Sequence, residues 1–258
     1  MRRRMEILVA AVVLFAGASP VMAVIEFKDG LTHDINYQID DHVLVDDRSP
    51  GMGTTVNILE EGSITPNHVL AGYEDSIINI VGGPIHELHV FDSTRVTVSG
   101  GAMYSLQIFD TCRVTVSGGA ISANLSANGS SQVAVSGGSI DGGLYVFDST
   151  RVTVSGGQIG RDIFAGWDTG DDNQITFLGW RFTVDGVPFG YGELTSIYGG
   201  TPYDEPARRL RGILVSGELL DNDFYIGGNA SIVLVPEPAT LLFLGLGGAA
   251  FLRKRRQI

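Results

Sequence analysis

The sequence predicts an all-β fold, a single-stranded parallel β-helix. Three observations point to it: a motif that recurs at nearly constant spacing, apolar residues that alternate within each copy, and a composition rich in turn residues. The 258 residues include 35 glycines, and only 18% are charged, which favours short strands and turns over amphipathic helices. The hydrophobic share of 44% is sufficient for a core, and we expect one body.

The repeat sets the period of the fold. Clear copies end in Ser-Gly-Gly, and a weaker first copy ends in Val-Gly-Gly. The first glycines of these pairs fall at positions 82, 100, 118, 137 and 156, so the spacing is 18, 18, 19 and 19 residues. A fixed period this short is typical of a solenoid, in which each copy forms one coil. The copies span residues 70–83, 88–101, 106–119, 125–138 and 144–157.

Each copy predicts three short strands. In the second copy Leu88 alternates with Val90 and Val96 with Val98, and turn residues separate the two runs. We expect one further inward residue after each glycine pair: Ala102, Ile121, Ile140 and Ile159. Stacked coils would lie ~4.8 Å apart, so that equivalent residues form ladders. Right-handed winding is favoured over left-handed, since the change from 18 to 19 residues breaks a hexapeptide register.

The chain divides into five segments. Residues 1–23 are expected to be a signal helix and 24–69 an N-terminal cap or irregular first coil. Residues 70–160 are the regular coils, and 161–234 are terminal coils that close the open end. Residues 235–258 form a tail with a short transmembrane helix over 239–252.

Both ends carry export features. Arg2–Arg4 precede an apolar stretch, and small residues before position 24 predict cleavage after Ala23. At the other end, an apolar run leads to the basic cluster at 253–256. This run is shorter than the ~20 residues that a transmembrane helix usually needs to cross a bilayer. Basic residues stay on the cytoplasmic side, so everything before Val235 is expected outside the cytoplasm.

The tail resembles the PEP-CTERM sorting signal, in which Pro-Glu-Pro precedes a short membrane segment and an arginine-rich end. The resemblance covers Val235 to Arg256. It implies that Pro236, Glu237 and Pro238 are a recognition element for an exosortase, a membrane enzyme that cuts near this motif. It also implies transient attachment to the inner membrane, then the outer surface or extracellular matrix, with exopolysaccharide as a candidate partner. The alternative is an uncut tail anchor in which Pro236 and Pro238 end a strand and begin a helix.

Charge and cysteine content exclude some functions. Without the two termini and their basic clusters, 10 Lys and Arg stand against 27 Asp and Glu, and so acidic a surface argues against nucleic-acid binding. The alternative to a merely solvated acidic surface is one that binds divalent cations loosely. The single cysteine, Cys112, replaces a threonine of the repeat, so we interpret it as a tolerated substitution and not as a nucleophile.

The repeat also predicts a surface ladder, here called the Phe-Asp-Arg ladder. In one degenerate copy, residues 125–138, the Phe, Asp and Arg of the ladder are lost together and are replaced by Asn128, Gly129 and Gln132. We expect aspartate to stabilise a turn and to pair with arginine; a carbohydrate-contacting face is the alternative. The ladder comprises Phe91, Asp92, Arg95, Phe109, Asp110, Arg113, Phe147, Asp148 and Arg151.

Candidate metal ligands are weak, and we expect no cofactor. Glu87 and His89 would share one outward face of a strand, as an acid–base or metal pair requires, but no third ligand is near in sequence. Turn oxygens suitable for calcium occur at Asp168, Asp171 and Asp172 and again at 221–223, without a known calcium-loop spacing.

Two functions remain open. The first is a structural or adhesive surface rod that presents the same groups along its length and is not an enzyme. The second is a polysaccharide-binding or polysaccharide-degrading β-helix enzyme, a lyase or hydrolase. Catalysis needs a unique constellation of groups, whereas most charges here recur at equivalent positions, so the sequence favours the rod.

Overall fold

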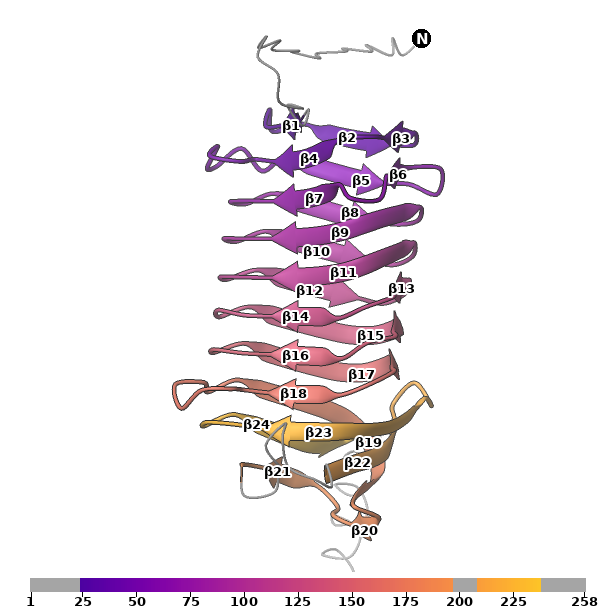
Figure 1. Ribbon diagram of the computed structural model, residues 1–258, viewed down its shortest axis with the longest axis vertical. Helices are drawn as coiled ribbons and strands as arrows, with labels where there is room; N and C mark the ends of the chain where they lie inside the picture. The colour runs from indigo at the N-terminus through magenta and orange to yellow at the C-terminus, as the bar shows by residue number, and fades with distance from the viewer. Residues whose placement is uncertain (1–23, 197–207, 238–258) are drawn as a thin grey trace, which may run out of the picture.

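The computed structural model describes residues 24–196 and 208–237, which form a parallel β-solenoid of about eight turns (Figure 1). The predicted all-β class and parallel β-helix are confirmed. In Figure 1 the near strands run to the left and the far strands to the right while the chain descends, so the winding is right-handed. The predicted signal helix over 1–23 and the transmembrane helix over 239–252 lie outside the described residues.

The coils have three faces. Face A carries the second run of each copy: β2 (Thr32–Ile35), β5 (Thr55–Ile58), β8 (Ile77–Ile80), β10 (Arg95–Val98), β12 (Arg113–Val116), β15 (Gln132–Ile140), β17 (Arg151–Ile159), β19 (Gln174–Val184) and β24 (Ser231–Pro236). Face B carries the first run: β1 (Val24–Phe27), β4 (His42–Val45), β7 (Val69–Gly72), β9 (Pro84–Val90), β11 (Ala102–Ile108), β14 (Leu125–Ala127), β16 (Leu144–Val146), β18 (Ile163–Ala165) and β23 (Leu219–Ile226).

Face C is the narrow third side. It consists of β3 (Gln38–Ile39), β6 (Ser63–Ile64) and β13 (Ala120–Ile121), together with the first residues of β9 and β11 and the last residues of β15 and β17. The regular coils therefore each have three strand segments, as the repeat predicts, although some segments continue from one face to the next.

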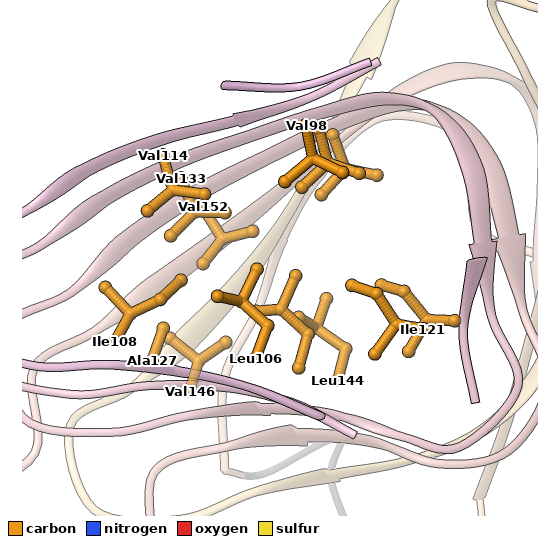
Figure 2. Close-up of a cluster of buried hydrophobic side chains, with 14 of the residues drawn as sticks. Val98, Leu106, Ile108, Val114, Ile121, Ala127, Val133, Leu144, Val146 and Val152 are labelled. Atoms are coloured by element: carbon orange, nitrogen blue, oxygen red, sulfur yellow. The ribbon is translucent and has the colours of Figure 1, made fainter. Parts of the chain in front are cut away.

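The core consists of inward ladders. Val114 lies in register with Val96 on one side and with Val133 on the other, and all three are almost fully buried. On face B, Leu106 stacks on Leu125, which stacks on Leu144. Figure 2 shows these ladders facing one another across the interior. Alternate residues such as Thr97 and Thr115 point to solvent, so the period of two in the sequence is the period of burial.

The prediction for face C is wrong in one coil. Ala102 was expected to point inward, but it is exposed and pairs with Ala120, while Met103 is buried and pairs with Ile121. The inward position is therefore the second residue after the glycine pair in this coil as in those that follow. The sequence suggested the wrong position because Ala102 is apolar and directly follows the glycines.

The glycine pair makes the turn from face A to face C. Gly119 has φ 82°, a conformation that side chains with a Cβ rarely adopt. A Cβ on Gly118 would lie 2.4 Å from the carbonyl oxygen of Ser99 in the preceding coil. The two glycines are thus needed for different reasons, one for its backbone angle and one for the close approach of the next coil.

The two ends of the solenoid are built differently. Strands within residues 24–69 already pair in parallel with the coils that follow. After β19 the chain adds β20 (Val187–Pro188), β21 (Gly192–Leu194) and β22 (Arg208–Leu214), which pair antiparallel with β19, β24 and β23. The last two strands, β23 and β24, return to faces B and A beneath β18 and β19.

Ion pairs join β22 to β23. Arg209 binds Asp221 (2.6 Å) and Asp223 (2.9 Å), and Arg211 binds Asp221 (2.7 Å). Hydrogen bonds from Arg209 and Arg211 lower the pKa of Asp221. Within the part of the chain that the structure describes, there is no helix of a length and hydropathy that could cross a membrane.

The ladders predict a large effect for a truncation in the core. Leu106→Ala removes a fully buried side chain between two neighbouring leucines of the stack, and we expect the free energy of unfolding to fall by about 2–5 kcal/mol. Urea unfolding followed by circular dichroism measures this change. The control is Thr115→Ala on the outer side of face A, which should change stability by no more than about 0.5 kcal/mol. Equal effects of the two substitutions would contradict the ladder as the main source of stability.

Candidate functional site

The Phe-Asp-Arg ladder lies at the turn from face B to face A, at the left edge of the solenoid in Figure 1. Asp92, Asp110 and Asp148 have φ of 57°, 54° and 55°, in the left-handed region. Aspartate tolerates this region better than most residues do. The first function of the aspartates is therefore to form the turn.

The aspartates also join neighbouring coils. Oδ2 of Asp110 accepts a hydrogen bond from the backbone N–H of Asp92 (3.1 Å), and Oδ2 of Asp92 accepts one from Glu74 (3.0 Å). Asp148 accepts in the same way from Gly129 (2.8 Å). Gly129 keeps the left-handed backbone, with φ 73°, but it has no carboxylate to offer to the coil before it. The degenerate copy thus keeps the turn and loses the bond.

The aromatic part of the ladder is interrupted. Tyr73, Phe91 and Phe109 form one continuous stack, with ring centroids 5.0 and 4.9 Å apart and ring planes within 8°. Asn128 follows, and Phe147 contacts Phe164 (5.9 Å). The ladder therefore has two aromatic parts, separated by the degenerate copy.

The arginines of the ladder do not pair with its aspartates. Arg95 and Arg113 lie side by side on face A, and Arg151 donates to the carbonyl oxygen of Asp172 (2.8 Å). Within residues 24–196 and 208–237, no ion pair joins an aspartate of the ladder to an arginine of the ladder, so the expected pairing is not formed. The aspartates bind backbone groups instead.

The loop after β18 uses its acidic residues in the same way. Asp171 is buried and accepts hydrogen bonds from the backbone N–H groups of Trp167, Asp168 (2.8 Å) and Asp148 (2.7 Å). Its carboxylate therefore closes the loop and continues the inter-coil contacts of the ladder. Asp172, the third calcium candidate, has its backbone N–H bonded to the carbonyl of Asp148 (2.9 Å).

The other candidate ligands lie apart. Nε2 of His89 is 3.0 Å from Oε2 of Glu87, and the ring of His86 stacks on Tyr104. Asp221 and Asp223 are held by arginines, as described above. Over the described ranges, no group of three or more His, Cys, Asp or Glu side chains could hold a metal ion.

Cys112 lies in a buried column of small polar residues that precedes face A. The column consists of Thr54, Ser76, Thr94, Cys112, Ser131, Thr150 and Asn173. Adjacent members of the column are joined by hydrogen bonds between hydroxyl groups, as between Ser76 and Thr94 (3.1 Å). The thiol of Cys112 points to the carbonyl oxygen of Asp92 (3.8 Å). Burial raises the pKa of the Cys112 thiol to about 12, which keeps it protonated and unreactive.

Face B holds a groove that the sequence reasoning missed, here called the Tyr104–Tyr145 groove. Its volume is about 310 Å³, and it crosses four successive coils. Tyr104 and Tyr145 lie among polar groups, and burial raises the pKa of the Tyr145 phenol. The polar side chains that line it are Glu87, Ser105, Gln107, Asn124 and Ser126.

The groove is continuous with two other surface features. Tyr104 also lines a second groove of about 370 Å³, along face C. Below Tyr145, Phe164 and Tyr225 occupy the same outward column of face B, with ring centroids 6.0 and 5.7 Å apart. The sequence does hold a signal for this column: His89, Gln107, Ser126, Tyr145 and Phe164 are equivalent positions of the repeat, and they change from polar to aromatic.

The predicted sorting signal begins within the fold. Pro236 is the last residue of β24 and pairs with Gly179 of β19, and Glu237 follows it directly. Pro238 lies outside the described residues, as does the predicted cleavage residue Ala23. The body therefore has no linker before the motif.

Comparison with protein families supports the interpretation of the tail as a sorting signal. The model described as the PEP-CTERM protein-sorting motif matches residues 234–256, which confirms the resemblance. The motif indicates exosortase-dependent sorting of an exported protein that is transiently anchored in the membrane. Neither the curated proteins nor the solved structures contain a match to this chain.

The turn geometry predicts a specific order of stability among variants at position 110. Asp110→Ala loses both the residue suited to φ 54° and the bond to Asp92, and should cost about 1–2 kcal/mol. Asp110→Asn keeps both features and should cost less than half of that. The measurement is urea unfolding, with the exposed Asp141→Ala as control. A cost for Asp110→Ala no greater than that of the control would refute the turn role.

The buried thiol predicts slow labelling. At pH 8 a thiol of pKa about 12 is ionised in about one molecule in ten thousand, so the native chain should react with a disulfide reagent at least about 1,000-fold more slowly than the urea-unfolded chain. The rate is followed by absorbance of the released thiolate. Labelling of the native chain at the unfolded rate would show that Cys112 is accessible.

Proposed function

We propose that the body is a non-catalytic rod that acts at the outer cell surface or in the extracellular matrix, with a structural or adhesive role. The observation that carries this proposal is the use of the repeated polar groups: the aspartates of the Phe-Asp-Arg ladder bind the backbone of neighbouring coils. One oxygen of each carboxylate is engaged in this way, which gives the repeated aspartates a role in the stability of the rod.

The sorting motif supports the location. An exported protein with this tail is held at the membrane before processing, and the solenoid is the part that processing would deliver. A parallel solenoid buries one continuous core along its length, which suits a role that needs a stiff, extended body.

The grooves support the non-catalytic assignment. Hydrolysis of a glycosidic bond uses two carboxylates that flank the scissile bond. Of the residues that the structure describes, Glu87 is the only carboxylate in the lining of the Tyr104–Tyr145 groove, and none lines the face C groove. A lyase or hydrolase is the competing function, and a hydrolase of the two-carboxylate type would need a second carboxylate at the same place.

The test follows the full chain in cells that contain an exosortase. An antibody against the body should detect the processed chain in the outer-surface or matrix fraction. Glu237→Gln alters the recognition element and should retain the chain in the inner-membrane fraction, whereas the exposed Glu193→Gln should be sorted normally.

Turnover is then measured on the protein recovered from the surface. Incubation with a panel of neutral and acidic polysaccharides should produce no new reducing ends and no unsaturated sugars. Either product would overturn the non-catalytic role, and a processed chain found only in the periplasm would overturn the surface location.

A further inference from the structure

We propose that the Tyr104–Tyr145 groove binds a neutral polysaccharide chain that lies along the solenoid axis. The proposal rests on the proposed function, since it gives the rod a ligand that it holds without cleaving. The site is on face B and face C, away from the turn that carries the Phe-Asp-Arg ladder.

The shape of the site suits a linear polymer. The groove runs from Glu87 on β9 to Tyr145 on β16, across coils that stack along the axis. The second groove begins at Gln38 on β3, crosses the coils of face C and meets the first groove at Tyr104. Both are open, so a chain can enter from the side and extend beyond either end.

Two aromatic rings offer sugar-binding faces. The C–H groups on one side of a sugar ring pack against the electron-rich face of an aromatic ring. Tyr104 is 51% exposed, and His86 supports it with a nearly parallel ring 5.3 Å away. Tyr145 is supported by Phe164 in the next coil. Because both rings are held in place before the ligand arrives, little conformational entropy is lost on binding.

The polar groups between the rings match hydroxyl groups. Ser105 Oγ is buried, with the residue only 7% exposed, and finds no hydrogen-bond partner among the described residues. An orphaned buried hydroxyl in a groove lining is costly unless a ligand or water satisfies it. Oδ1 of Asn124 accepts from the backbone N–H of Gly143 (2.9 Å), which leaves its amide N–H groups as donors. Gln107 adds a second amide, so the lining offers both donors and acceptors to sugar hydroxyl groups.

The charge of the groove lining favours a neutral polysaccharide over an anionic one. Among the described residues, Glu87 is the only charged side chain that lines the Tyr104–Tyr145 groove, and no Lys or Arg lines either groove. A carboxylate accepts hydrogen bonds from hydroxyl groups but repels uronates, sulfates and phosphates. The acidic surface of the body adds to this repulsion. Anionic polysaccharides and nucleic acids are therefore disfavoured.

The test measures binding of the full chain, purified in detergent, by affinity electrophoresis. The neutral gels contain dextran, a mixed-linkage β-glucan or a galactomannan, and the anionic gels contain alginate or polygalacturonate. We expect retardation by at least one neutral polysaccharide and by neither anionic one. Tyr104→Ala and Gln107→Ala should each weaken that binding about tenfold or more.

Two controls separate the groove from the rest of the surface. Tyr37→Ala removes a tyrosine of similar exposure, 54%, outside both groove linings, and Arg113→Ala alters the Phe-Asp-Arg ladder. Both should leave the affinity within about twofold. Circular dichroism checks that each variant is folded, and Gln107→Ala keeps the test decisive if a tyrosine variant does not fold.

The outcomes distinguish the two proposals. Failure to bind any neutral polysaccharide, binding only to anionic ones, or binding lost in Arg113→Ala but kept in Tyr104→Ala and Gln107→Ala would each overturn the groove assignment and leave the rod intact. Cleavage of a bound polysaccharide would overturn the non-catalytic rod and leave the groove as its binding site.

Discussion

The structure depends on the parallel stacking of equivalent inward residues from coil to coil. No single coil can bury its own apolar side chains, so Val114 is buried only because Val96 and Val133 cover it from either side. This requirement fixes the register, and within the paired strands the register places most outward residues above their equivalents in the next coil. The turn aspartates, the hydroxyl column that contains Cys112 and the aromatic column of face B are all consequences of it.

Most of this architecture could be predicted from the sequence because it follows from periodicity. The glycine pairs, the alternation in Leu88–Val90 and Val96–Val98, and the Pro-Glu-Pro tail are local patterns with one physical meaning each. Ala102 was assigned wrongly because a single small apolar residue carries no information about the side to which it points. The pairing of aspartate with arginine was also expected wrongly, since charge alone does not reveal that a backbone N–H lies closer than a guanidinium.

The Tyr104–Tyr145 groove was missed for a different reason. Its residues come from four coils and do not repeat, so no motif marks them. Outward positions of face B looked like ordinary solvent-facing residues, and the change from Gln107 and Ser126 to Tyr145 and Phe164 becomes visible only once the coils are aligned. In a solenoid, recognition of a ligand is found where the repeat varies, whereas stability is found where it is constant.

The exit of the chain from the last coil has a mechanical consequence. β24 ends at Pro236, which is also the first residue of the Pro-Glu-Pro motif, so a force applied to the tail would act directly on this strand. Tension along the solenoid axis then acts parallel to the β19–β24 hydrogen bonds and opens them one after another from the carboxyl end. β21 clamps residues 232–234 from the other side, so Val235 and Pro236 yield first. Force on the tail would therefore load the pairing of Val235 and Pro236 with β19 before it reached any coil of the body.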